Sequence, residues 1–324
     1  MRKIITSLCL LLSLATVSGK DYTDQLTVTV NEESYSQEAT ISLVENENGT
    51  YTLSLKNFIL YSENSDLPVG NITLEDIDAI VTNHGLVFDE QEDIYITNGD
   101  DEEVDFWIGP MLCEEIGAVP ISLRAVLDGE KLYAVIDIDL TEGLGQIINV
   151  QFSTPAEEDE YTAAIESVTV ADKEVSPSPL DFEDGPDYVK FFTADVELSH
   201  VPTIEEVVVK TVGKNPYTFI EVQPAKENDF GVEGINTDCD YLVMVGNYAA
   251  DLKSAEGWFI SVTVVEDVIN YDLNGDGKIS TADIQVIINE MKKPADSQNK
   301  AYDLNSDGKI STADIQVIIN EMKK

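Results

Sequence analysis

The sequence predicts a mainly β protein that ends in a small helical module. Between residues 20 and 266, many short segments alternate apolar and polar residues, which is the period of half-buried strands. The pairs Asn48-Gly49 and Asp128-Gly129 separate some of these segments and favour tight hairpin turns. A segment of 22 residues then occurs twice, at 272–293 and 303–324, with only Gly275 and Ser306 differing, and each copy ends in a helical pattern. We therefore expect an antiparallel β-barrel, a β-sandwich and a helical module.

The first residues are expected to be removed from the folded protein. Arg2 and Lys3 precede an apolar run at residues 8–12, and small residues follow at 17–19. This order predicts a secretory signal peptide over residues 1–19. The run is too short to span a membrane, and no later stretch is apolar enough to do so. We expect a protein that is secreted or held at the cell surface.

The block at residues 20–154 predicts the barrel. Its alternating segments are joined by short turns, and consecutive antiparallel strands of this kind favour an up-and-down meander that closes on itself. The segments are residues 25–31, 39–45, 50–58, 119–126 and 131–140.

The block at residues 155–266 predicts the sandwich. It opens with an acidic linker at 155–160, and six strand-like segments follow with Pro, Gly and Asn between them. The segments are residues 164–170, 189–199, 205–212, 218–223, 241–248 and 258–265.

Composition limits the partners. Residues 20–266 hold 52 of the 62 acidic residues but only ten Lys and Arg, so this surface repels nucleic acid and anionic membranes. Cys113 and Cys239 are the two cysteines that follow the signal peptide, and their small number favours free thiols over a bridge. With so many acids, a carboxylate pair suited to glycoside hydrolysis arises by chance, and no nucleophile or zinc motif accompanies His84 or His200. We expect a non-catalytic protein.

The repeated segment predicts calcium loops. Oxygen ligands at positions one, three, five and twelve, with Gly at position six, suit a hard cation, and position seven offers its backbone carbonyl. Position nine acts through water, and the lack of soft ligands argues against zinc. The first loop offers Asp272, Asn274, Asp276, Lys278, Ser280 and Asp283, and the second offers Asp303, Asn305, Asp307, Lys309, Ser311 and Asp314. We expect two calcium ions.

Each loop leads into a helix. Ser280 and Asp283 form a capping pattern, and Ile284, Ile287, Ile288 and Met291 then make one apolar stripe. The second copy repeats this stripe as Ile315, Ile318, Ile319 and Met322. One such helix cannot cover its stripe alone, so the two helices are expected to pack together.

The repeat resembles a type I dockerin, a module that binds cohesin domains of scaffold or cell-surface proteins. Asp at position twelve departs from the Glu of an ordinary EF-hand, and each unit lacks the entering helix, which makes it an F-hand. The resemblance covers residues 272–324 and implies a dockerin domain over 267–324. It implies that these residues contact the cohesin: Thr281, Ala282, Lys292, Lys293, Thr312, Ala313, Lys323 and Lys324.

The first block is similar to the calycin-like β-barrel domain of secreted Bacteroidales proteins. The similar segments include NGTYTLSLKNF at residues 48–58 and DGEKLYAVIDIDL at 128–140. Such a barrel can hold a carbohydrate or a small apolar ligand, or its side chains can fill it and leave a scaffold. Trp107 and Trp258 fit core or rim packing better than sugar platforms.

Together these features predict a secreted, non-catalytic protein that a calcium-dependent dockerin attaches to a cohesin-bearing partner in a polysaccharide-handling assembly. One alternative is a glycoside hydrolase, or another polysaccharide-degrading enzyme, with its active site in the middle block. A second alternative is a surface adhesin or spacer that associates with itself through the repeat.

Overall fold

The computed structural model describes most of the chain, and its secondary structure is mainly strand. The predicted signal peptide lies outside the described residues except for Gly19, and so does nearly all of the linker predicted at 155–160. The chain divides into two compact units, Met1–Val264 and Val265–Lys324. The described residues are 19–61, 66–141, 145–155, 161–181, 186–213, 217–227, 234–265 and 270–323.

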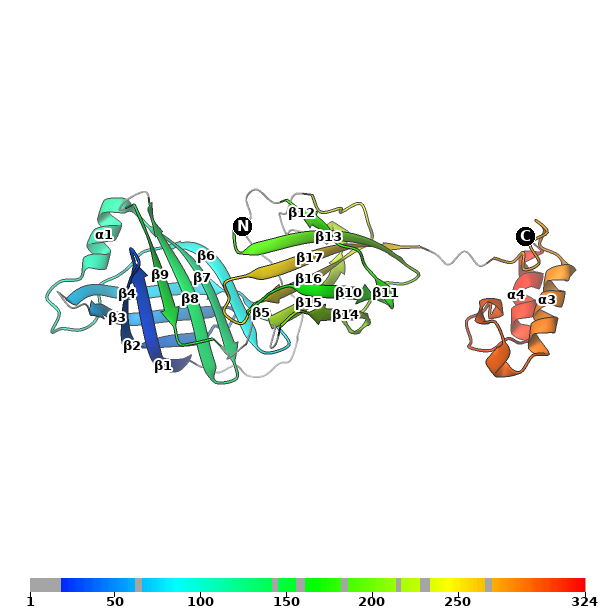
Figure 1. The fold of residues 1–324 in the computed structure, drawn as a ribbon, viewed down its shortest axis with the longest axis horizontal. Coiled ribbons are helices and arrows are strands. Elements are labelled where there is room, and N and C mark those ends of the chain that lie inside the picture. The colour runs from blue at the N-terminus through cyan, green and yellow to red at the C-terminus, as the bar shows by residue number, and fades with distance from the viewer. Residues whose placement is uncertain are drawn as a thin grey trace. The chain divides into compact units, whose positions relative to one another are not determined.

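Nine antiparallel strands form the first sheet of the N-terminal unit (Figure 1). Their order across the sheet is β4-β3-β2-β1-β9-β8-β7-β6-β5, so neighbouring strands are consecutive in the chain except β9 and β1. The strands are β1 (Gly19–Val30), β2 (Glu33–Glu45), β3 (Tyr51–Tyr61), β4 (Asp66–Ile77), β5 (Ala79–Val81), β6 (Leu86–Ile94), β7 (Val119–Asp128), β8 (Lys131–Leu140) and β9 (Gln146–Phe152).

The sheet curls into a barrel because its two edges belong to one stretch of chain. β4 is one edge strand and β5 is the other, yet only Asp78 separates them in the sequence. A bridge between Asn71 and Thr97 adds a second link between β4 and the segment after β6. The predicted meander that closes into a barrel is therefore confirmed.

Apolar side chains fill the inside of the barrel. Alternate residues of every long strand point inward, and many of them are almost completely buried. Helix α1 (Ile108–Ile116) packs against β4, where Gly109 lies so close to the Val69 carbonyl that a Cβ would not fit. The buried interior includes Leu26, Ile41, Leu53, Leu74, Phe88, Leu123, Ala134 and Phe152.

Two further sheets form the predicted sandwich. One has the order β11-β10-β14 and the other the order β12-β13-β17-β16-β15, and buried residues of both make a shared core. The pair β13–β17 is parallel, whereas the other paired strands of the sandwich are antiparallel. The strands are β10 (Ile165–Val170), β11 (Lys173–Glu174), β12 (Ser178–Leu180), β13 (Val189–Leu198), β14 (Val207–Thr211), β15 (Tyr217–Pro224), β16 (Tyr241–Tyr248) and β17 (Ala255–Val264).

The C-terminal unit contains two helices and two short 3-10 turns. Ile287 of α3 (Thr281–Met291) and Ile318 of α4 (Thr312–Glu321) are fully buried, and both belong to one apolar cluster that includes Leu304. The ends of the expected stripes differ from the prediction, because Met291 and Met322 are 36% and 43% exposed. The helices therefore cover each other around Ile287 and Ile318 rather than along the whole stripe.

Candidate calcium loops and docking faces

The first loop curls around the carboxylate of Asp272. This carboxylate accepts backbone N–H groups from Gly275 at 3.0 Å, Asp276 at 3.1 Å and Gly277 at 2.8 Å. Gly277 has a φ of 83°, in the left-handed region that glycine adopts without strain. Position one thus organises the turn, and position six permits it.

Positions three and five lie on the same side of this turn. The Asn274 side chain donates to the Asp276 carboxylate at 3.1 Å and accepts the Asp276 backbone N–H at 2.8 Å. Asp276 also accepts the Lys278 N–H at 3.0 Å. Lys278 thus contributes its backbone N–H to the loop, and the role of its carbonyl as a ligand stays a prediction.

Asp283 joins the loop to the helix. It is fully buried, and its two oxygens accept the N–H groups of Asn274 at 3.1 Å and Ser280 at 2.7 Å. Burial acts to raise the pKa of Asp283, but its backbone hydrogen bonds outweigh burial and lower it. Ser280 in turn accepts the Ala282 N–H, which completes the predicted capping box of α3.

The second loop repeats most of this geometry. Asp303 accepts the N–H groups of Asp307 and Gly308, and Asn305 donates to Asp307 at 3.1 Å. Asp314 is fully buried and accepts from Asn305 at 3.2 Å and Ser311 at 2.7 Å. One backbone difference accompanies the one sequence difference, since Ser306 has a φ of 55° where Gly275 has 75°.

The donor set of each loop fits calcium by its chemistry. Carboxylate, amide, hydroxyl and carbonyl oxygens are the ligands that calcium prefers. Among the residues that the structure describes, no three His, Cys, Asp or Glu side chains gather as a ready metal cluster. The loop carboxylates instead hold backbone N–H groups, so calcium would share oxygens that the loop has already oriented.

The residues expected to face a cohesin lie at both ends of the two helices. Thr281, Ala282 and Lys292 are exposed on the first unit. Thr312, Ala313 and Lys323 are exposed on the second, and Lys324 lies outside the described residues.

One contact of the first docking face was missed by the sequence analysis. Lys293 is exposed, but its ammonium group donates to Glu290 at 2.7 Å. Glu290 is buried and also accepts the Asn299 N–H at 2.7 Å, so it ties the end of α3 to the segment between the repeats. The sequence did offer a signal, because Glu290 and Lys293 are three residues apart and residues at this spacing are neighbours on a helix.

Two family models match the chain, and one of them covers this unit. Residues 270–323 match the dockerin type I domain. The C-terminal unit is a dockerin type I domain. Such domains generally bind calcium and attach their proteins to cohesin domains, and proteins that contain a dockerin are typically extracellular. Residues 17–154 match the Calycin-like beta-barrel domain, which confirms the second resemblance.

No curated protein and no solved structure matches the chain. None of the helices in the described part of the protein has the length and apolarity that a membrane span needs. Both cysteines that follow the predicted signal peptide are free thiols. Cys113 is buried, whereas Cys239 is partly exposed.

Proposed function

We propose that this is an exported, non-catalytic protein that its dockerin attaches to a cohesin-bearing partner in a polysaccharide-handling assembly. The observation that carries the proposal is the dockerin match over two loop-helix units with the same hydrogen-bond pattern. In this proposal a signal peptide at residues 1–19 precedes the barrel at 20–154, the sandwich at 155–266 and the dockerin at 267–324.

The proposal includes two calcium ions, one in each loop. The first would be held by Asp272, Asn274, Asp276, the Lys278 carbonyl and Asp283, with Ser280 acting through water. The second would be held by Asp303, Asn305, Asp307, the Lys309 carbonyl and Asp314, with Ser311 acting through water. Calcium supplies positive charge that offsets the three carboxylates of each loop, and this favours the folded dockerin.

Calcium titration of the chelated full chain by isothermal calorimetry tests the ion count. We expect two ions for each chain, and one ion after Asp272→Ala or after Asp303→Ala. Asp296→Ala is the matched control, because Asp296 is an exposed acid between the two loops and should leave both ions bound. Two ions retained by the Asp272→Ala chain would contradict the ligand assignment.

Chelation gives a second test that needs no partner. Each loop gathers three carboxylates whose repulsion calcium would offset, so we expect a chelator to remove helical circular dichroism and calcium to restore it. Both tryptophans lie outside the dockerin, at positions 107 and 258, so their fluorescence should not change. Helical signal that ignores both chelator and calcium would contradict calcium-coupled folding.

The partner is tested with the full chain and a panel of recombinant type I cohesin domains. We expect capture in calcium and release by a chelator. If calcium instead caused the chain to dimerise and no cohesin bound, self-association through the repeat would replace the proposal.

The apolar side chains inside the barrel pack together as one buried cluster, and this supports a scaffold role for the barrel. A carbohydrate or small apolar ligand at the barrel remains a prediction. Incubation of the full chain with polysaccharides, followed by a reducing-sugar assay, tests the non-catalytic role. Release of reducing ends would favour the hydrolase alternative.

A further inference from the structure

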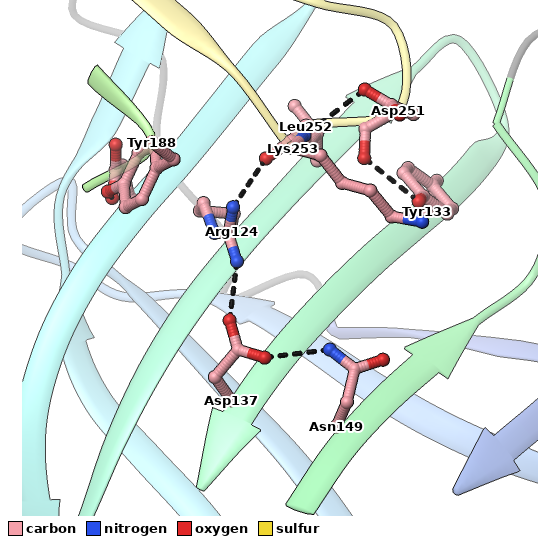
Figure 2. A network of polar contacts seen from close by, with 9 residues as sticks. Arg124, Tyr133, Asp137, Asn149, Tyr188, Asp251, Leu252 and Lys253 are labelled. Carbon is pink, nitrogen blue, oxygen red and sulfur yellow. Dashed lines mark hydrogen bonds and ion pairs between the residues drawn. The ribbon is translucent and has the colours of Figure 1, made fainter. Parts of the chain in front are cut away.

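The barrel and the sandwich meet at a buried arginine. Arg124 of β7 is only 6% exposed, although its neighbours Leu123 and Ala125 point into the barrel and Arg124 therefore points outward. Figure 2 shows its guanidinium group between two partners, the Leu252 carbonyl at 2.7 Å and the Asp137 carboxylate at 2.5 Å. Leu252 belongs to the β16–β17 turn of the sandwich, and Asp137 belongs to β8 of the barrel. One side chain therefore spans the two parts.

A carboxylate beside Arg124 makes a second polar link. Asp89 of β6 accepts the hydroxyl groups of Tyr188 at 2.5 Å and Tyr248 at 2.8 Å, and both tyrosines belong to the sandwich. The guanidinium carbon of Arg124 also lies 4.3 Å from the centre of the Tyr188 ring. Burial raises the pKa of Asp89, although both hydroxyls and Arg124 oppose this.

Apolar residues surround these polar contacts. Val87, Val126 and Val135 on the outer face of the barrel share one buried cluster with Tyr217 and Leu252 of the sandwich. At the edge of the cluster, Tyr133 donates to the Asp251 carbonyl at 3.0 Å (Figure 2). The apolar contacts favour association of the barrel and the sandwich in many relative orientations. The Arg124 and Asp89 contacts can all form together in only one of these orientations.

We propose that this cluster is a fixed joint that makes the barrel and the sandwich fold and unfold as one unit. Its apolar part supplies the attraction, and Arg124 with Asp89 sets the orientation. The barrel and the sandwich therefore move as a single rigid body, rather than as two modules that turn independently. This inference does not depend on calcium or on a cohesin.

Two tryptophans make the proposal measurable, because one lies in each part. Trp107 is buried beside α1 of the barrel, and Trp258 is buried in the core of the sandwich. Trp258→Phe leaves a barrel reporter, and Trp107→Phe leaves a sandwich reporter. In each background of the calcium-saturated full chain, urea unfolding is followed by fluorescence for one part and by strand circular dichroism for the whole.

We expect fluorescence and circular dichroism to give one midpoint in both backgrounds. Arg124→Met, and separately Tyr188→Phe with Tyr248→Phe, should split them by more than about 0.5 M urea. Lys131→Met is the control, because it removes an exposed positive charge from neighbouring β8 and should leave a single midpoint. If Arg124→Met does not fold, the double tyrosine variant decides, since it removes only two oxygen atoms. Two midpoints without the joint variants, or a single unchanged midpoint with them, would overturn the proposal.

Discussion

At the scale of residues, the two calcium loops differ at one position whose backbone has a positive φ. Gly275 adopts 75° and Ser306 adopts 55°, and a Cβ at Gly275 would meet no atom within 4 Å. A residue with a Cβ destabilises the fold by roughly 1–2 kcal/mol in the left-handed region. Glycine avoids this strain, but its greater freedom in the unfolded chain costs about 0.5–1 kcal/mol on folding. The second loop is therefore slightly strained relative to the first.

Ser306→Gly should stabilise the dockerin by up to about 1 kcal/mol, because the left-handed strain that it removes exceeds the entropic cost of glycine. Gly275→Ser is the reciprocal variant and should destabilise the dockerin by a similar amount. Thermal unfolding of the calcium-loaded full chain, followed by helical circular dichroism, compares the two. Shifts of the same sign in both variants would show that strain at this position does not set the difference.

At the scale of elements, the two loop-helix units are alike enough to exchange roles. Each helix begins with the same capping box, and each exposes Thr and Ala at its first two positions. The two Thr-Ala pairs belong to different helices, and we expect them to lie on separate surfaces of the dockerin. Either surface could then meet the same cohesin after a half-turn.

Changing one surface should leave binding nearly intact. We expect Thr281→Glu with Ala282→Glu to weaken cohesin binding only about twofold, since one of two equivalent modes is lost. Thr312→Glu with Ala313→Glu should do the same, and all four changes together should abolish binding. Glutamate suits the first turn of a helix, so folding should persist. Calorimetry against one cohesin domain measures each case. Complete loss from one pair alone would assign docking to a single unit.

At the scale of the whole molecule, the barrel and the sandwich share a compact unit, and buried tyrosines lie where they meet. Burial is the main cause that raises the pKa values of Tyr133, Tyr188 and Tyr248 above the ordinary value of about 10. Above that pH, the unfolded chain releases protons that the folded chain keeps. The stability that these groups contribute is thus complete below pH 10 and decreases as the pH rises further.

We therefore expect the urea midpoint of the N-terminal unit, followed by Trp258 fluorescence, to fall between pH 9 and pH 11. Tyr188→Phe with Tyr248→Phe should make this fall shallower, because two of the tyrosines whose pKa burial raises are gone. A midpoint that stays constant over this range would show that the tyrosines are more accessible to water than the structure indicates.

Much of the fold follows from local patterns. The barrel, the sandwich strands and the two capped helices were predicted from strand alternation, turn pairs and an apolar stripe, and the structure confirms them. The calcium ligands were predicted from their spacing alone and stay a prediction. The exposure of Met291 and Met322 was not predicted, because the extent of helix contact depends on how the two helices meet.

The sequence by itself determined the two capped helices, the repeated segment that leads into them and the strands that alternate clearly, because their signals lie within a few neighbouring residues. Only the tertiary structure decided that β4 and β5 close the barrel and that Arg124 reaches the Leu252 carbonyl of the sandwich. Arg124 occupies an outward position of a half-buried strand, where a charged residue normally faces water. Its role depends on a segment more than a hundred residues away, and no local pattern records which distant surface will cover a strand.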